Sequence, residues 1–316
     1  MILVTGGLGF IGQHTARALV DLGERCLVTR HRSAAEHGLI PETGVVVETT
    51  DIGDPRALAA LGERYEITGI IHLAGGSPGS ADLVDVLRAS GDQMINVLRV
   101  AQDWRVRRVT LASTIGVYAG ATKTSPLRED APLPVHGMAP IPAAKKSAET
   151  IGKLVAERGG FGFAAARISA AWGPLGRPAS PFFALPRMVH AAVAGEVADF
   201  GAPPPAAYED DGIDMCHVAD VGRALALLAA APSLRYDTYN VGSGRATTAG
   251  QVAAAVRTAV PDAKIVLPAG RNPANPDPDP YLDITRLCED TGFTPSIDLA
   301  TGIVDYVDWL RAGNAR

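Results

Sequence analysis

The chain opens with Met1-Ile2-Leu3-Val4-Thr5-Gly6-Gly7-Leu8-Gly9-Phe10-Ile11-Gly12, which predicts a strand, a tight turn and the start of a helix. The run from Met1 to Thr5 is apolar enough for a buried strand, and the stretch from Phe10 to Leu22 has the pattern of an amphipathic helix. Glycines let the backbone approach a ligand, and a helix N-terminus offers unpaired N–H groups and partial positive charge. We interpret this stretch as a diphosphate site, although the same glycines would also suit a packing turn in another α/β protein.

Composition places the chain among ordinary globular proteins. Its 316 residues suffice for one large α/β domain or for a nucleotide domain with a smaller substrate region. The net charge of -5 argues against a general nucleic-acid or membrane-surface role. The three cysteines lie far apart and predict neither a disulfide framework nor a metal site. No apolar run reaches about 18 residues, and the first strand begins at Met1, so we expect no membrane span, no signal peptide and a cytoplasmic location.

Strands and helices alternate through the first half of the chain. Strands are expected near residues 1–5, 25–29, 45–48, 69–73, 108–112 and 161–168, with helices between them. This order predicts a Rossmann-type, doubly wound parallel sheet covered by helices on both faces, with ligands at the carboxyl ends of the strands.

The pattern is less regular after residue 168. Short helices are expected at 182–194, 218–230, 248–260 and 300–311, and strand-like pieces near 197–200, 239–241 and 264–267. We therefore predict a dinucleotide-binding domain over 1–170, to which 214–243 returns. Residues 171–316 would form mainly a smaller C-terminal α/β substrate-binding region.

Several short motifs occur in the order found in one family. They include Asp51-Ile52-Gly53-Asp54, His72-Leu73-Ala74-Gly75, Ser113-Thr114 with Val117-Tyr118, Trp172-Gly173-Pro174, His217-Val218 with Asp220, and Tyr239-Asn240-Val241-Gly242. Together with the glycine turn, they make the chain resemble the extended short-chain dehydrogenases/reductases, the NAD-dependent epimerase/dehydratase group. The resemblance covers nearly the whole chain.

The resemblance implies roles along the sheet edge. Thr114 matches the family's catalytic Ser/Thr, and Lys145 matches the lysine of its Tyr-x-x-x-Lys motif. The positions implied for the cofactor are Gly6, Gly9, Phe10, Ile11, Gly12, Asp51, Ile52, Leu73, Ala74, Gly75 and Lys145.

The second strand predicts which dinucleotide is bound. In NAD-binding proteins this strand usually ends in a carboxylate that holds the adenosine ribose hydroxyls. Here the position is Arg30, followed two residues later by Arg32. Because guanidinium groups attract a 2′-phosphate and a carboxylate repels it, we predict NADP in preference to NAD. The alternative is that both arginines are solvated loop charges.

The tyrosine of the Tyr-x-x-x-Lys motif is missing. In the family it is the acid/base beside the nicotinamide, and the lysine four residues later favours its phenolate. Its position is Ile141 in this chain, which has no proton to give. His136, just before the helix, and Tyr208, on a Pro-rich loop, are candidate substitutes, with surface or packing roles as the alternative for each.

Two further departures concern the substrate. The family often has Asn at the position of Ala170 and Arg at the position of Ile213. Without those polar groups a nucleotide-diphosphate sugar is poorly held, so a smaller or more apolar substrate is predicted.

These observations leave three functions open. The first is an NADP-dependent oxidoreductase or epimerase with a substitute acid/base. The second is a repurposed lyase or isomerase that recycles the cofactor within each turnover, and the third is a non-catalytic dinucleotide-binding sensor. The resemblance also implies a homodimer through the helical stretches 81–104 and 143–157.

Overall fold

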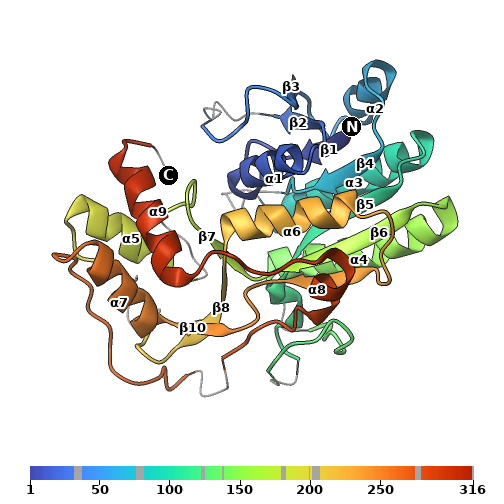
Figure 1. The fold of residues 1–316 in the computed structure, drawn as a ribbon. Coiled ribbons are helices and arrows are strands. Elements are labelled where there is room, and N and C mark those ends of the chain that lie inside the picture. Colours follow the sequence, from blue (N-terminus) through green and yellow to red (C-terminus); the bar gives the residue numbers. More distant parts are fainter. Residues whose placement is uncertain are drawn as a thin grey trace.

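A seven-stranded parallel sheet forms the centre of the molecule (Figure 1). The computed structural model describes residues 1–31, 38–75, 82–121, 125–136, 139–178, 183–198, 200, 207–274 and 279–314. The strand order is β3-β2-β1-β4-β5-β6-β9, and each neighbouring pair is parallel. The strands are β1 Ile2–Thr5, β2 Cys26–Arg30, β3 Val45–Thr49, β4 Gly69–His72, β5 Arg108–Thr114, β6 Gly162–Ile168 and β9 Thr238–Val241. The predicted Rossmann-type sheet is confirmed.

Helices cover both faces of this sheet because its strands carry apolar side chains on both sides. Helices α1 (Phe10–Asp21) and α6 (Val218–Ala230) pack together on one face, against Ile2 and Val4 of β1 among others. Helices α2 (Pro55–Arg64), α3 (Leu83–Asp103) and α4 (Pro140–Gly159) enclose the core of the other face, which contains Leu3. Asp54 caps α2, since its carboxylate accepts the N–H groups of Arg56 and Ala57.

A smaller C-terminal lobe lies beyond the carboxyl ends of the strands, at the left of Figure 1. It contains a three-stranded sheet of order β10-β8-β7 and helices packed around one shared core. Its elements are β7 Ala170–Trp172, β8 Gly212–His217, β10 Ala246–Thr248, α5 Leu185–Ala194, α7 Ala249–Ala259 and α9 Leu299–Arg311. A 3₁₀ turn, η1 (Ile115–Tyr118), follows β5, and α8 (Thr285–Thr291) packs against β9.

The sequence patterns missed several short elements. The strands β7, β8 and β10 and the helix α8 were not predicted, and residues 197 and 264 form only an isolated bridge. Within residues 214–243, α6 and β9 join the large sheet layer, whereas β8 belongs to the small sheet.

Candidate functional site

The glycine turn between β1 and α1 is held in one conformation by close backbone contacts. Gly6 has φ +68°, and its N–H donates to the Thr29 hydroxyl over 3.2 Å. The Gly9 N–H donates to the Gly6 carbonyl over 2.9 Å. A Cβ added to Gly12 would lie 2.5 Å from the Gly6 oxygen and the Gly7 Cα, so only glycine fits there.

The N-terminus of α1 suits a diphosphate. Gly9 is the N-cap residue and supplies no side-chain acceptor, so the first N–H groups of α1 stay available for a ligand. No acidic side chain lies in the first turn, so nothing there repels an anion. The backbone cradle and the helix end therefore fit the diphosphate of a dinucleotide.

The adenosine end of this edge carries Arg30 at the end of β2. Its guanidinium donates to the Thr49 hydroxyl, with Nη2 at 3.0 Å and Nε at 3.3 Å, and is paired with no carboxylate among the described residues. Asp51 accepts the Gly53 N–H and lies 3.3 Å from the His31 ring, and Ile52 is buried. Arg32 lies outside the described residues.

The end of β4 brings a histidine into the same edge. His72 is buried, and its Nδ1 lies 2.8 Å from the Thr5 hydroxyl, which also accepts the Ala74 N–H over 3.4 Å. This contact fixes the start of Leu73-Ala74-Gly75 beside the glycine turn, where the Ala74 nitrogen would lie 2.9 Å from a Cβ at Gly6. Burial and then the charge of Lys145 lower the pKa of His72 to about 3, so the ring is neutral.

Helix α4 carries Ile141 and Lys145 to the end of β5. The helix packs against β5 and η1, and the Pro142 ring leaves no room for a side chain at Gly116. Thr114 accepts the Gly116 N–H over 3.1 Å, and its own O–H has no acceptor among the residues that the structure describes. Burial lowers the pKa of Lys145 to about 8, although the Glu149 carboxylate opposes that effect. The half-buried Lys145 has no hydrogen bond or ion pair within the part of the chain that the structure describes.

The two candidate substitutes for tyrosine occupy different surroundings. His136 is exposed, in a loop whose Pro134 carbonyl accepts a hydrogen bond from Lys146. Tyr208 is half-buried in the C-terminal lobe, where its backbone N–H donates to Asp211 over 3.1 Å. The catalytic role of each stays a prediction.

A network of buried polar side chains connects the elements that carry the candidate site. The Arg167 guanidinium grips Glu149, with Nη2–Oε2 at 2.8 Å and Nε–Oε1 at 3.1 Å, and both residues are 3% exposed. Ser113 donates to the same carboxylate over 2.5 Å. Arg167 also donates to the Tyr118 oxygen over 2.9 Å, and the Tyr118 hydroxyl donates to Asn240 over 2.8 Å. Tyr118, at the end of η1, thus links β6 and β9.

The family follows from a comparison with known families. The model of the NAD dependent epimerase/dehydratase family matches residues 2–242, which include the glycine turn, Lys145 and β9. The chain belongs to this family. That assignment confirms the resemblance seen in the motifs, and the family is described as NAD dependent.

Similar proteins of this family act on sugar nucleotides according to their names. A UDP-glucose 4-epimerase of Azospirillum brasilense is 29% identical, over 98% of this chain and 92% of its own length. A UDP-glucuronate 4-epimerase of Thermodesulfobacterium geofontis is 26% identical, over 77% of this chain and 75% of its own.

Solved structures share the fold over nearly the full length. The UDP-glucose 4-epimerase of Thermotoga maritima with UDP-glucose has a TM-score of 0.81 at 22% identity, covering 99% of both chains. The Thermus thermophilus UDP-glucose 4-epimerase complex with NAD has a TM-score of 0.81 at 23% identity, also covering 99% of both chains.

The two positions at which this chain departs from the family on the substrate side, Ala170 and Ile213, lie on neighbouring strands of the small lobe. Met215 of β8 is the register partner of Ala170 in β7, and Ile213 and Met215 line a cavity of about 220 Å³. Most of its lining residues have apolar side chains, but its wall also exposes polar groups, and Asp211 and Asn272 are its charged and amide members. Arg271 nearby is paired with Asp279, at 2.5 and 3.1 Å.

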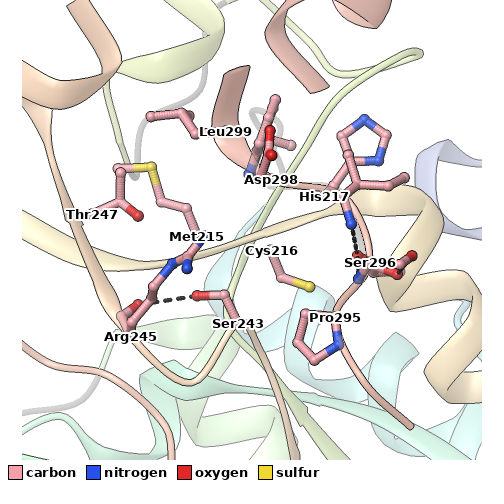
Figure 2. Close-up of a pocket in the computed structure, with 13 residues that line it drawn as sticks. Met215, Cys216, His217, Ser243, Arg245, Thr247, Pro295, Ser296, Asp298 and Leu299 are labelled. Atoms are coloured by element: carbon pink, nitrogen blue, oxygen red, sulfur yellow. Dashed lines mark hydrogen bonds between the residues drawn. The ribbon is translucent and has the colours of Figure 1, made fainter. Parts of the chain in front are cut away.

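A second cavity, of about 260 Å³, lies between the end of β8 and the residues leading into α9 (Figure 2). Met215, Arg245 and Thr247 lie on one side of it, and Pro295, Ser296 and Asp298 on the other. Trp172 and His217 belong to its lining. The indole N–H and the His217 Nε2 have no hydrogen-bond partner among the described residues, although Nε2 lies 3.8 Å from the Asp305 carboxylate.

Among the residues that the structure describes, no helix is both long and apolar enough to cross a membrane.

Proposed function

We propose that this chain is an NADP-dependent oxidoreductase or epimerase acting on a small substrate that lacks a nucleotide diphosphate. The proposal rests mainly on one observation, which is that several candidate residues lie at the same edge of the sheet. There the glycine turn, the end of β4, Thr114 and Lys145 come together without the usual tyrosine. A bound nicotinamide dinucleotide would supply hydride acceptance and donation. The chain supplies a ribose contact from Lys145, a hydrogen bond from Thr114 and a substitute acid/base.

The charge around Arg30 supports the choice of NADP. The nearby carboxylates already have partners: Glu48 contacts Arg64 and Tyr65, and Asp51 contacts His31. Because the Arg30 guanidinium is bound only to a hydroxyl, it can turn toward a 2′-phosphate without breaking an ion pair. Arg32 would add a second cation.

The cavity beside Ile213, whose described lining residues include no lysine or arginine, supports the choice of substrate. A diphosphate needs cations, whereas the polar members of this wall are a carboxylate and an amide, and Arg271 is held by Asp279. Apolar protein cavities of ~150 Å³ accept a benzene ring. A cavity of about 220 Å³ therefore has room for a small apolar group of a substrate.

Two titrations and one activity panel test the proposal. We expect NADPH to bind at least about tenfold more tightly than NADH, a difference of ~1.4 kcal/mol. Arg30→Glu should reverse this order, and Arg25→Glu, a substitution outside the predicted site, should leave it unchanged. The panel compares small aldehydes, ketones and alcohols with UDP-glucose and UDP-glucuronate, and turnover of a UDP-sugar alone would contradict the substrate assignment.

The isoleucine at position 141 favours two alternative functions. A lyase or isomerase that recycles its cofactor would form product with no net change in NADPH absorbance. A non-catalytic sensor would bind the dinucleotide tightly and turn over nothing. Product analysis by mass spectrometry beside the absorbance assay separates these three outcomes.

We also propose a homodimer through α3 and α4. Apolar side chains are exposed along these two helices, namely Leu83, Val84, Leu87 and Ile95 on α3 and Ile151 and Leu154 on α4. Covering such a stripe with a second copy removes apolar surface from water.

A further inference from the structure

Lys145 lies at the sheet edge of the candidate site and has no hydrogen bond or ion pair among the described residues. Lys146 is anchored to the Pro134 carbonyl and Lys153 lies 3.0 Å from Asp237, whereas Lys145 has no such partner in the described residues. Glu149, one helical turn away, cannot take that role because Arg167 and Ser113 already occupy its oxygens. The Lys145 head group is therefore available to a ligand.

The surroundings of Lys145 place its ammonium in the site. Its charge acts on the ring of His72, which lies at the end of β4 and contacts Thr5 in the strand leading to the glycine turn. The groups that face it are neutral His72 from β4 and Glu149 from its own helix. The residue at the preceding turn, Ile141, offers no proton.

We propose that Lys145 itself is the acid/base of this enzyme, in direct contact with the substrate oxygen, in place of the missing tyrosine. The inference rests on the proposed function. The neutral Lys145 amine would take the hydroxyl proton as the alcohol loses its hydride to an oxidised nicotinamide dinucleotide and becomes a carbonyl. The ammonium would return that proton when the carbonyl receives a hydride from the reduced dinucleotide. The free O–H of Thr114 donates to the same oxygen and orients it.

Burial makes this role effective at neutral pH. With its pKa lowered to about 8, Lys145 exists in both protonation states near pH 7.5, which is what an acid/base of this kind needs. Carbonyl reduction needs the ammonium and should slow as pH rises through about 8, whereas alcohol oxidation needs the amine and should accelerate over the same range.

The first test reads ionisation without turnover. Trace labelling of the intact protein with acetic anhydride across pH, followed by peptide mass spectrometry, gives a midpoint for each of the five lysines. We expect a midpoint near 8 for Lys145, values near the usual ~10.4 for exposed lysines, and protection of Lys145 by NADPH. A Lys145 midpoint above ~10, or no protection, would overturn the proposal.

The second test separates proton transfer from binding. Lys145→Arg keeps the charge but cannot deprotonate, so the hydride step in single turnover should fall ~10²–10⁴-fold while the NADPH dissociation constant stays within about threefold. Lys146→Arg is the matched control and should keep the wild-type rate. Adding Ile141→Tyr to Lys145→Arg should restore part of the rate, because a phenol then stands one turn before a cation.

The outcomes distinguish this inference from the proposed function. If the wild type transfers hydride and Lys145→Arg does so within about threefold, the acid/base assignment is wrong and the proposed function stands. If the wild type transfers no hydride to any carbonyl or UDP-sugar in the panel, the proposed function fails and the role of Lys145 fails with it.

Discussion

Removing Arg167 should destabilise the fold strongly, because its partner Glu149 would stay behind in a buried site. Both side chains are 3% exposed, and the guanidinium makes bonds of 2.8, 3.1 and 3.3 Å to the carboxylate. It also donates to Tyr118 and to the Glu129 carbonyl. Breaking a buried ion pair from one side costs about 3–5 kcal/mol, and we expect Arg167→Met to fall in that range.

Two further variants test whether the loss of stability in Arg167→Met comes from the uncompensated charge of Glu149. Replacing both partners, as in Arg167→Met with Glu149→Met, removes the uncompensated charge and should recover at least about half of the loss. The pair Arg64–Glu48 joins at 2.6 Å but has a half-exposed arginine, so Arg64→Met should cost at most about 1 kcal/mol.

Urea unfolding followed by far-UV circular dichroism measures all three free energies of unfolding. A loss below about 1 kcal/mol for Arg167→Met would refute the reasoning. So would a double variant that is no more stable than Arg167→Met alone.

Three other perturbations follow from the structure. Gly12→Ala places a Cβ 2.5 Å from the backbone of the turn and should weaken NADPH binding in a calorimetric titration at least tenfold, whereas Gly91→Ala, with open space around it, should not. Burial lowers the pKa of His217 from 6.5 to about 4, so its contribution to the free energy of unfolding is complete above pH 6.5 and is lost as the pH falls toward 4. His217→Asn should therefore remove ~3 kcal/mol from the change in the free energy of unfolding over that pH range. Leu154→Lys should convert the proposed dimer to a monomer in sedimentation velocity, while Val304→Lys, equally 48% exposed on α9, should leave it unchanged.

The large sheet was predictable because its strands, apart from the half-buried edge strand β3, are buried on both faces. Such strands are continuous apolar runs, and glycines, caps and prolines separate them from the helices. Asp54 before Pro55 gave the start of α2, and Pro142 indicated the first turn of α4. The strand-turn-helix unit at Met1–Gly12 followed from the same signals.

The small lobe could not be predicted in the same way. β7 and β10 have three residues each, too few to show a period. β8 carries Asp214 at its centre, a residue that disfavours strands. Asp214 is fully buried there because N–H groups of Ser243, Gly244 and Leu282 donate to it from distant parts of the chain.

The sequence identified candidate residues of the site but did not show which of them lie close together. The motifs named Thr114 and Lys145, and Arg30 was read from the end of the second strand. The proximity of Lys145 to His72 depends on how α4 packs against β5, and the Arg167–Glu149 pair depends on how α4 packs against β6. Neither packing arrangement can be read from the pattern of residues along the chain.

The position of β9 at the sheet edge has a consequence for synthesis. β9 and α6 are made only after β7, α5 and β8, yet they complete the sheet and cover α1. A nascent chain that ends after β6 exposes an unpaired strand edge and the apolar surface of α1, both of which favour aggregation. The cofactor site at the first dozen residues therefore matures late, once residue 241 has left the ribosome.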